Sequence, residues 1–453
     1  MNHTGERANV PPATGERGRG GGAGQLNLLG LLSYGLLTMP LAMAGLAMLT
    51  YLPTFYAVDM GLGLTAVGIA AVLGRLLDVF TDPVVGHLSD RTRSRFGPRR
   101  PWMAAGIVGF SIAIWFAMVP PAGAGIVYLA LAGAAYFLFG TLLDVPYSSV
   151  GLELSPDIRE RTRLASVKAA FQVAGAILAG FFPLILAVPV ALALPQMALA
   201  IIVLAFAGFV LFVTVVPVPH ANVVRPQLGA LEAFRITGAH RGFRILLSAF
   251  ALVQTGNAFF SGLAVLYVTF VLGAEPLVGL LIGLLFLGTA ALLPFWYALA
   301  GRVGKLATWK IGIVASGIGF SLLAMCGPAD TTAIAVLFFL IGGTFGADAV
   351  MPTSMLADIA YREEVAENRR QSGLFVAIKN ATSKLAFVVP LAVAFPLLDL
   401  VEFEERAGSD PMVGLVFLAF FVAIPVVFKI AALGLLSGTR SHQLTQLSGA
   451  ATT

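Results

Sequence analysis

Charged residues are scarce in this chain. Aspartate, glutamate, lysine and arginine make up 11% of its 453 residues, less than half of the roughly 25% that soluble globular proteins carry. So few charges cannot cover a water-facing surface of normal size, which argues against a soluble enzyme, a secreted domain and a nucleic-acid-binding protein. The single cysteine, Cys326, excludes a disulfide framework and a cysteine-based metal site.

Motifs for chemistry are missing as well. The five histidines are scattered, and the sequence contains neither HExxH nor a glycine-rich phosphate-binding loop. Because no nucleophile–base set is visible either, we expect no enzymatic activity, no ATP hydrolysis, no cofactor and no metal beyond a possible sodium ion.

Long apolar runs are what the sequence has instead. Hydrophobic residues account for 58% of the chain, in runs of about twenty residues or more, long enough for helices that cross a bilayer. Membrane β-barrels are excluded, because their strands alternate polar and apolar residues in short segments. We predict an all-α membrane protein with twelve spans, at 28–55, 64–88, 101–119, 125–151, 164–187, 196–217, 243–271, 276–299, 310–327, 331–356, 373–398 and 411–437.

Lysine and arginine gather in every second loop. Because cytoplasmic loops are enriched in these residues, we expect the loops after the even-numbered spans, and both termini, to be cytoplasmic. The alternate loops hold neither residue until Arg406. We therefore predict a multi-pass protein of a bacterial inner (plasma) membrane. The basic residues that define the cytoplasmic loops are Arg91, Arg93, Arg95, Arg99, Arg100, Arg159, Arg161, Arg163, Arg302, Lys305, Arg362, Arg369 and Arg370.

A long polar segment divides the spans into six plus six. Two six-span halves joined by a basic middle loop are the repeat layout of a major facilitator transporter, whose halves rock about a central site. We predict a disordered cytoplasmic tail at 1–26, a six-helix bundle at 27–217, a cytoplasmic linker at 218–242, a second six-helix bundle at 243–437 and a cytoplasmic tail at 438–453. We expect this transporter to be a monomer.

Charges within the spans are costly, so each needs a reason. Arg75, Asp78 and Asp82 in the second span are three and four residues apart, which puts them on one helix face. Thr141 and Asp144 share a face of the fourth span in the same way. The other intramembrane charges that we single out are Lys168, Asp348, Lys379 and Lys384; the sequence assigns no role to Asp348 or Lys379.

These acids have two interpretations. As a cation-binding site, the carboxylates of Asp78, Asp82 and Asp144 and the hydroxyl of Thr141 supply the hard oxygen ligands that sodium prefers, and a proton would use the same groups. As structural pairs, the second-span acids neutralise Arg75, and Asp144 neutralises Lys168. If pairing with Arg75 were their only role, one of the two second-span acids would have no partner. This favours the cation site.

The charged loop residues also have two interpretations. They enforce topology, or some of them form inter-helix ion pairs that latch the closed cytoplasmic side. The candidate gating residues are Asp90, Arg91, Glu153, Arg161 and Asp358.

Several motifs occur in a familiar order. Residues 75–83 read RLLDVFTDP and are followed by SDRTR at 89–93; DVPY at 144–147 precedes ELSP at 153–156; MLAD at 355–358 precedes Lys384. Together they resemble the glycoside–pentoside–hexuronide:cation symporter family of the major facilitator superfamily, over roughly residues 30–437. The resemblance implies a cation site at Asp78, Asp82, Thr141 and Asp144.

The resemblance also implies a substrate site, at Arg75, Asp144, Lys168 and Lys384. Here the chain departs from sugar-binding members of the family: Ala42 stands in place of an acid in the first span, and Ser148 in place of an aromatic residue. The main hypothesis is therefore symport of a sugar or glycoside with sodium or a proton. The alternative is a transporter of the same fold for an amphipathic or non-sugar solute such as a lysolipid. A scaffold without transport activity is disfavoured by the retained intramembrane charges.

Overall fold

The computed structural model describes residues 26–154, 158–216, 241–367, 372–406 and 410–438, and these residues are helical apart from their short connections. Twelve segments are long and apolar enough to cross a membrane. They run Leu28–Asp59, Leu64–Arg91, Arg100–Met118, Ile126–Gly151, Arg163–Leu186, Val190–Val215, Arg241–Val271, Glu275–Val303, Lys305–Leu323, Thr331–Leu356, Ile378–Leu400 and Pro411–Ser437. The twelve predicted spans are thereby confirmed.

Two spans begin five or six residues earlier than predicted. The sixth starts at Val190, not 196, because Pro195 lies in the second turn of its helix and not ahead of it. The ninth starts at Lys305, not 310, directly after Gly304, whose backbone φ of 86° ends the preceding helix. The first turn of this helix contains polar residues, so a prediction from apolar runs places the start of the span too late.

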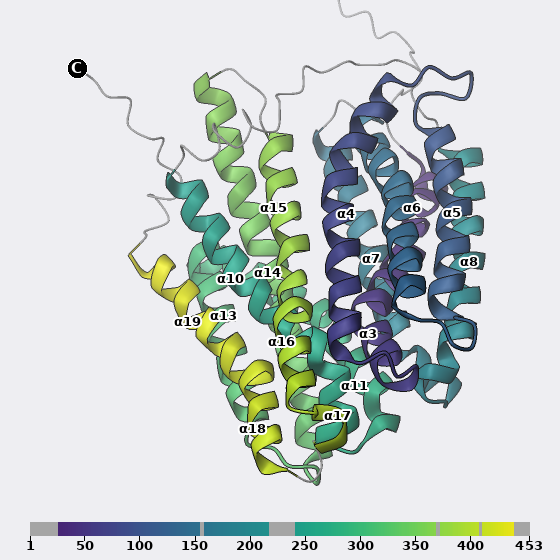
Figure 1. Cartoon of the computed structure of the whole chain (residues 1–453). Coiled ribbons are helices and arrows are strands. Elements are labelled where there is room, and N and C mark those ends of the chain that lie inside the picture. Colours follow the sequence, from purple (N-terminus) through teal and green to yellow (C-terminus); the bar gives the residue numbers. More distant parts are fainter. Residues whose placement is uncertain (1–25, 155–157, 217–240, 368–371, 407–409, 439–453) are drawn as a thin grey trace, which may run out of the picture.

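Eight helices precede the polar segment and lie together on one side of the molecule, in purple to blue (Figure 1). The first span is interrupted at Leu37, between α1 and α2, and by a wider helical turn at Ala47–Tyr51, between α2 and α3; a second wider turn, Phe55–Asp59, ends it. The helices are α1 (Leu28–Leu36), α2 (Thr38–Leu46), α3 (Leu52–Thr54), α4 (Leu64–Arg91), α5 (Arg100–Met118), α6 (Ile126–Glu153), α7 (Ile158–Leu186) and α8 (Val190–Val215).

The remaining helices lie on the other side, in teal to yellow (Figure 1). They are α10 (Arg241–Leu266), α11 (Val278–Ala291), α12 (Leu293–Val303), α13 (Lys305–Leu323), α14 (Thr331–Glu367), α15 (Ser372–Ala386), α16 (Val388–Leu400), α17 (Phe403–Arg406), α18 (Pro411–Leu418) and α19 (Ile424–Ser437). Most of the linker predicted at 218–242 lies outside the described residues, so the exact limits of the two halves stay a prediction.

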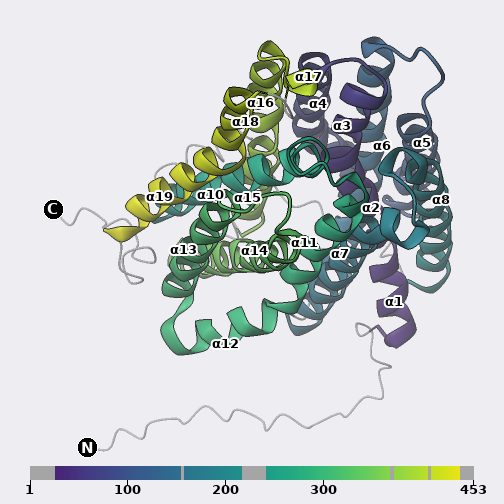
Figure 2. The ribbon, with the colours of Figure 1, turned by 90° about the horizontal axis from the view of Figure 1, so that it is seen from below.

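The most extensive contacts between the two groups of helices are those of α7 with α11 and of α4 with α16, which are also neighbours in the view from below (Figure 2). Both contacts depend on glycine. A Cβ at Gly180 of α7 would lie 2.8 Å from the Cα of Gly283 in α11, and one at Gly68 of α4 would lie 2.4 Å from the carbonyl oxygen of Leu391 in α16. The backbones of the halves therefore touch where α4 begins and α7 ends.

Close helix packing also occurs within the second group, where α14 crosses α11. A Cβ at Gly342 would lie 1.8 Å from the carbonyl oxygen of Leu285. We expect Gly342→Ala to lower the free energy of unfolding by about 1–3 kcal/mol, because the two backbones must separate to admit the methyl group. The effect is measured as the melting temperature of the purified protein in detergent.

Gly317 of α13 is the matched control, since a Cβ there meets nothing within 4 Å. Gly317→Ala is expected to leave the melting temperature unchanged or to raise it, because alanine favours helix. Equal melting temperatures for the two variants would contradict this account of the contact.

Candidate functional site

The acids of α4 and the hydroxyl of α6 come together between two neighbouring helices. Asp78 and Asp82 are one turn apart and project from the same face of α4, as their spacing predicts. The Oγ1 atom of Thr141 on α6 lies 3.1 Å from Oδ1 of Asp78 and 3.0 Å from Oδ1 of Asp82. Three of the four residues predicted for the cation site thus form one cluster.

Lys384 reaches this cluster from the other half of the protein. Its Nζ lies 2.9 Å from Oδ2 of Asp78 and 2.6 Å from Oδ2 of Asp82. The Asp78 side chain is 7% exposed, whereas those of Asp82 and Lys384 are 33% and 28% exposed. One ammonium group from α15 therefore bridges two carboxylates of α4 in a site that remains partly open to solvent.

Arg75 completes the charge balance of the cluster. Its Nη1 lies 3.2 Å from Oδ2 of Asp78, and its guanidinium group lies 4.8 Å from the centre of the Phe137 ring. With Lys384 it supplies two positive charges to match the two carboxylates. The cluster as a whole is electrically neutral, which is what a partly buried group of charges within a membrane requires.

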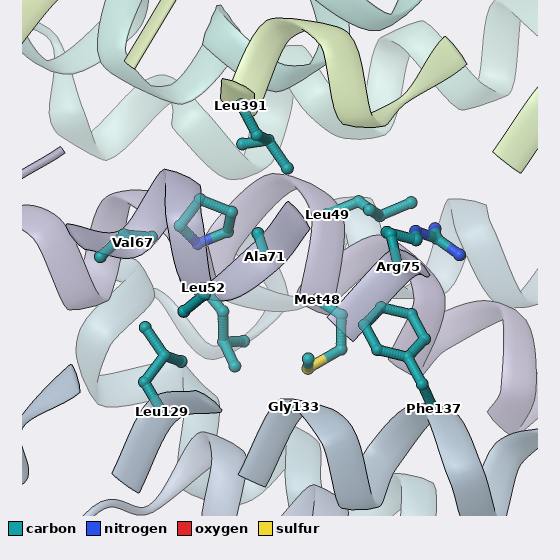
Figure 3. A pocket seen from close by; sticks show the side chains of 12 residues that line it. Met48, Leu49, Leu52, Val67, Ala71, Arg75, Leu129, Gly133, Phe137 and Leu391 are labelled. Atoms are coloured by element: carbon teal, nitrogen blue, oxygen red, sulfur yellow. The ribbon is translucent and has the colours of Figure 1, made fainter. Parts of the chain in front are cut away.

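Arg75 also borders an apolar cavity between α3, α4, α6 and α16 (Figure 3). Among the described residues that line it, Arg75 is the one charged side chain, and it lies beside Phe137. The others include Met48, Leu49, Leu52, Val67, Ala71, Leu129, Gly133 and Leu391.

Asp144 belongs to a second cluster. Its Oδ1 lies 3.1 Å from Nζ of Lys168 and 3.3 Å from Oγ of Ser148, and those two atoms are 2.6 Å apart. Lys168 Nζ also lies 4.8 Å from the centre of the Tyr147 ring. The charge of Lys384, which bridges the first cluster, also acts on Asp144. The place of Asp144 in the cation site stays a prediction.

Two of the candidate gating residues each form an ion pair within their own half of the protein. Asp90 Oδ1 lies 2.5 Å from Nη1 of Arg99 at the start of the next helix, and Asp358 Oδ2 lies 2.6 Å from Nζ of Lys305. Arg91 is exposed at the end of α4. The side chains of Glu153 and Arg161 lie outside the described part of the structure. A latch between the halves therefore stays a prediction.

Two lysines fall outside this site. Lys379 lies on α15 with its Nζ 5.5 Å from the centre of the Phe250 ring. Lys429, which the sequence analysis does not single out, is buried on α19 and forms an ion pair with Asp348. Its position well inside the span Pro411–Ser437 was the signal that would have identified it, because a lysine far from both ends of a span is costly.

The arrangement is suited to binding a cation. Four carboxylate oxygens and one hydroxyl oxygen lie close together, and hard cations prefer oxygen ligands. A proton would bind to the same carboxylates. The Lys384 ammonium already bridges the two carboxylates, so a cation at these oxygens would compete with it. If the cation displaced Lys384, the ion pairs between α15 and α4 would be lost.

Comparison with known proteins identifies the family. The family model described as MFS/sugar transport protein matches residues 33–439. The putative glycoside/cation symporter YagG of Escherichia coli is 25% identical over 89% of this chain and 90% of its own length. An uncharacterized symporter of Synechocystis is 34% identical, over 38% of this chain and 33% of its own length. The sodium-dependent lysophosphatidylcholine symporter 1 of Gallus gallus is 22% identical over 89% of this chain and 84% of its own length.

Solved structures show the same fold. The nucleoside transporter NupG superposes with a TM-score of 0.65 at 14% identity, covering 91% of this chain and 100% of its own. A bacterial homologue of the human lysosomal transporter Spinster gives a TM-score of 0.66 at 13% identity, covering 90% and 95%. Both the fold and the family are those of membrane transporters and not of enzymes. This multi-pass membrane protein belongs to the MFS/sugar transport protein family, among its glycoside/hexuronide:cation symporter-like members.

Proposed function

We propose that the protein carries out symport of a sugar or glycoside with sodium or a proton, by alternating access. The observation that supports this most strongly is the bridge from Lys384 to Asp78 and Asp82. In this bridge the Lys384 ammonium occupies the oxygen-rich site and would compete with a cation there. The bridge also joins the two halves, whose relative movement would transport the substrate.

Coupling follows from this competition. A cation that binds to Asp78, Asp82 and Thr141 displaces the Lys384 ammonium, because the carboxylate oxygens cannot serve both. Displacement breaks the ionic tie between α4 and α15. Cation binding is thereby linked to the movement of one half relative to the other.

Alternating access is supported by the uneven contact between the halves. They pack backbone to backbone through Gly68 and Gly180, where α4 begins and α7 ends. Asp82 and Lys384 remain partly exposed instead of being sealed between the halves. We infer that the protein is closed at the glycine end and open to the ion site from the other end, which the loop charges assign to the cytoplasm.

The second cluster is the candidate substrate site. Asp144, Lys168 and Ser148 offer a carboxylate, an ammonium and a hydroxyl group within hydrogen-bonding distance of one another, and such groups bind sugar hydroxyls. The name of the E. coli relative, a putative glycoside/cation symporter, supports a glycoside. We place the protein in a bacterial inner membrane as a monomer with both termini in the cytoplasm.

A lysolipid or another amphipathic solute is the second candidate substrate. The apolar side chains around Arg75 support it, because an acyl chain could pack against them beside one charged group. Ala42 and Ser148 stand where sugar-binding relatives have an acid and an aromatic residue, which weakens the sugar hypothesis. The lysophosphatidylcholine symporters among the relatives support this alternative.

Removal of one carboxylate charge tests the cation site. We expect Asp82→Asn to weaken activation of uptake by the coupling cation about ten- to a hundredfold, since an amide oxygen is a poorer ligand than a carboxylate. Uptake into proteoliposomes, measured against sodium concentration and against pH, is the readout. The exposed acid Glu405 provides the matched control, Glu405→Gln. Uptake by Asp82→Asn with the same dependence on sodium and on pH as the wild type would refute the site.

Ligand-induced stabilisation distinguishes the two substrate classes. A ligand that binds the native state raises its melting temperature by mass action, so purified protein is screened against sugars, glycosides and lysolipids with and without sodium and across pH. We expect a sugar or glycoside to give a shift that the coupling cation enlarges. A shift with lysolipids alone would favour the amphipathic substrate and would reject the sugar.

A further inference from the structure

A second group of charges lies inside the second half, away from the cation cluster. Nζ of Lys429 on α19 is 2.7 Å from Oδ2 of Asp348 on α14, and each side chain is 1% exposed. An ion pair this deeply buried is strongly destabilising unless its remaining hydrogen-bonding capacity is satisfied. The other partners of Asp348 are therefore informative.

The Asp348 carboxylate has two further donors. Nδ2 of Asn257 on α10 donates to Oδ2 at 2.9 Å, and Nε1 of Trp309 on α13 donates to Oδ1 at 3.0 Å. Asp348 thus holds four helices, α10, α13, α14 and α19, in one fixed arrangement. Asn257 is 4% exposed, so its hydrogen bond to the carboxylate is shielded from water.

A chain of amides continues from this group towards α15. Nδ2 of Asn257 lies 3.4 Å from Oε1 of Gln254, one turn earlier on α10, and Nε2 of Gln254 lies 3.2 Å from Oγ of Ser383 on α15. Ser383 directly precedes Lys384. Adjacent residues of a helix point about 100° apart, so α15 turns Ser383 towards α10 and Lys384 towards α4.

We propose that Gln254 and Asn257 are positioning residues for cation coupling: anchored on buried Asp348, they hold α15 so that Lys384 meets Asp78 and Asp82. This inference rests on the proposed function, since it assumes that a cation competes with Lys384. The helix is then held from both sides, by an ionic contact that a cation can replace and by an amide contact that it cannot.

The direction of the effect follows from competition. A helix that is fixed in place presents its ammonium group to the carboxylates with little further loss of freedom, which makes that group a strong competitor. A loosened α15 presents the same group less well. The cation then displaces Lys384 more easily, so loss of the amide chain strengthens cation binding even though it removes a contact.

The experiment compares Gln254→Met, which keeps the size of the side chain, with Gln196→Met at an exposed glutamine of α8. The melting temperature of the purified full-length protein is recorded while NaCl replaces choline chloride at constant ionic strength, and separately across pH without sodium. We expect Gln254→Met to lower the half-saturating sodium concentration about three- to tenfold, the effect of one hydrogen bond. If the proton is the cation, the midpoint of the pH titration rises. Gln196→Met is expected to match the wild type.

Asn257→Leu provides a second test of the same chain. If Gln254 and Asn257 act in series, the double variant shows the shift of Gln254→Met alone, whereas independent effects add. An additive shift overturns the proposal. So does a Gln254→Met protein that melts at a lower temperature with unchanged or weaker cation binding, since that result shows a merely structural role.

The titrations of the wild-type protein distinguish failure of the positioning role from failure of the proposed cation-coupled function. A wild-type melting temperature that responds to neither sodium nor pH overturns both the cation site and the positioning role. A wild-type response that Gln254→Met leaves unaltered overturns the positioning role alone.

Discussion

One ammonium group between two carboxylates is the interaction on which the remainder of the site depends. Lys384 bridges Asp78 and Asp82 from the opposite half. Without it, the two negative charges of these acids would be balanced only by the single positive charge of Arg75 among their described ion-pair partners. The membrane does not tolerate unbalanced charge at low cost. The bridge therefore neutralises the acids whenever no other cation is bound to them, and the proposed coupling is the exchange of one positive charge for another.

The two buried charge groups differ in what they can exchange. The Asp348–Lys429 pair is enclosed at 1% exposure and has its partners on four helices, which suits a fixed support. The Asp82–Lys384 pair is about one-third exposed, which allows ions to reach it. Exposure, more than the type of residue, separates the pair that holds the second half together from the pair proposed to switch.

The sequence predicted the parts that depend on periodicity. The twelve spans follow from apolar run length, and the shared face of Arg75, Asp78 and Asp82 follows from their spacing on one helix. Contacts between helices were predicted only as alternatives. The pairing of Asp144 with Lys168 was one of two interpretations, and the structure contains that ion pair, but spacing along α6 does not reveal that Thr141 turns to Asp78 instead. The resemblance pointed to Lys384, but Gln254 and Asn257, as neutral amides in a long apolar helix, gave no signal of their connection to it. The gating role of Asp90 and Asp358 stays a prediction.

The glycine contacts between α7 and α11 have an energetic consequence for the cycle. At Gly180 and Gly283 the backbones of α7 and α11 touch, and the Phe181 ring of α7 packs against Gly283. Separation of the halves at this point therefore exposes the Phe181 ring as well as backbone, and removes the dispersion contacts of that ring. In the proposed cycle, the binding of the ion and the solute must offset the free energy of these contacts before the closed end can open.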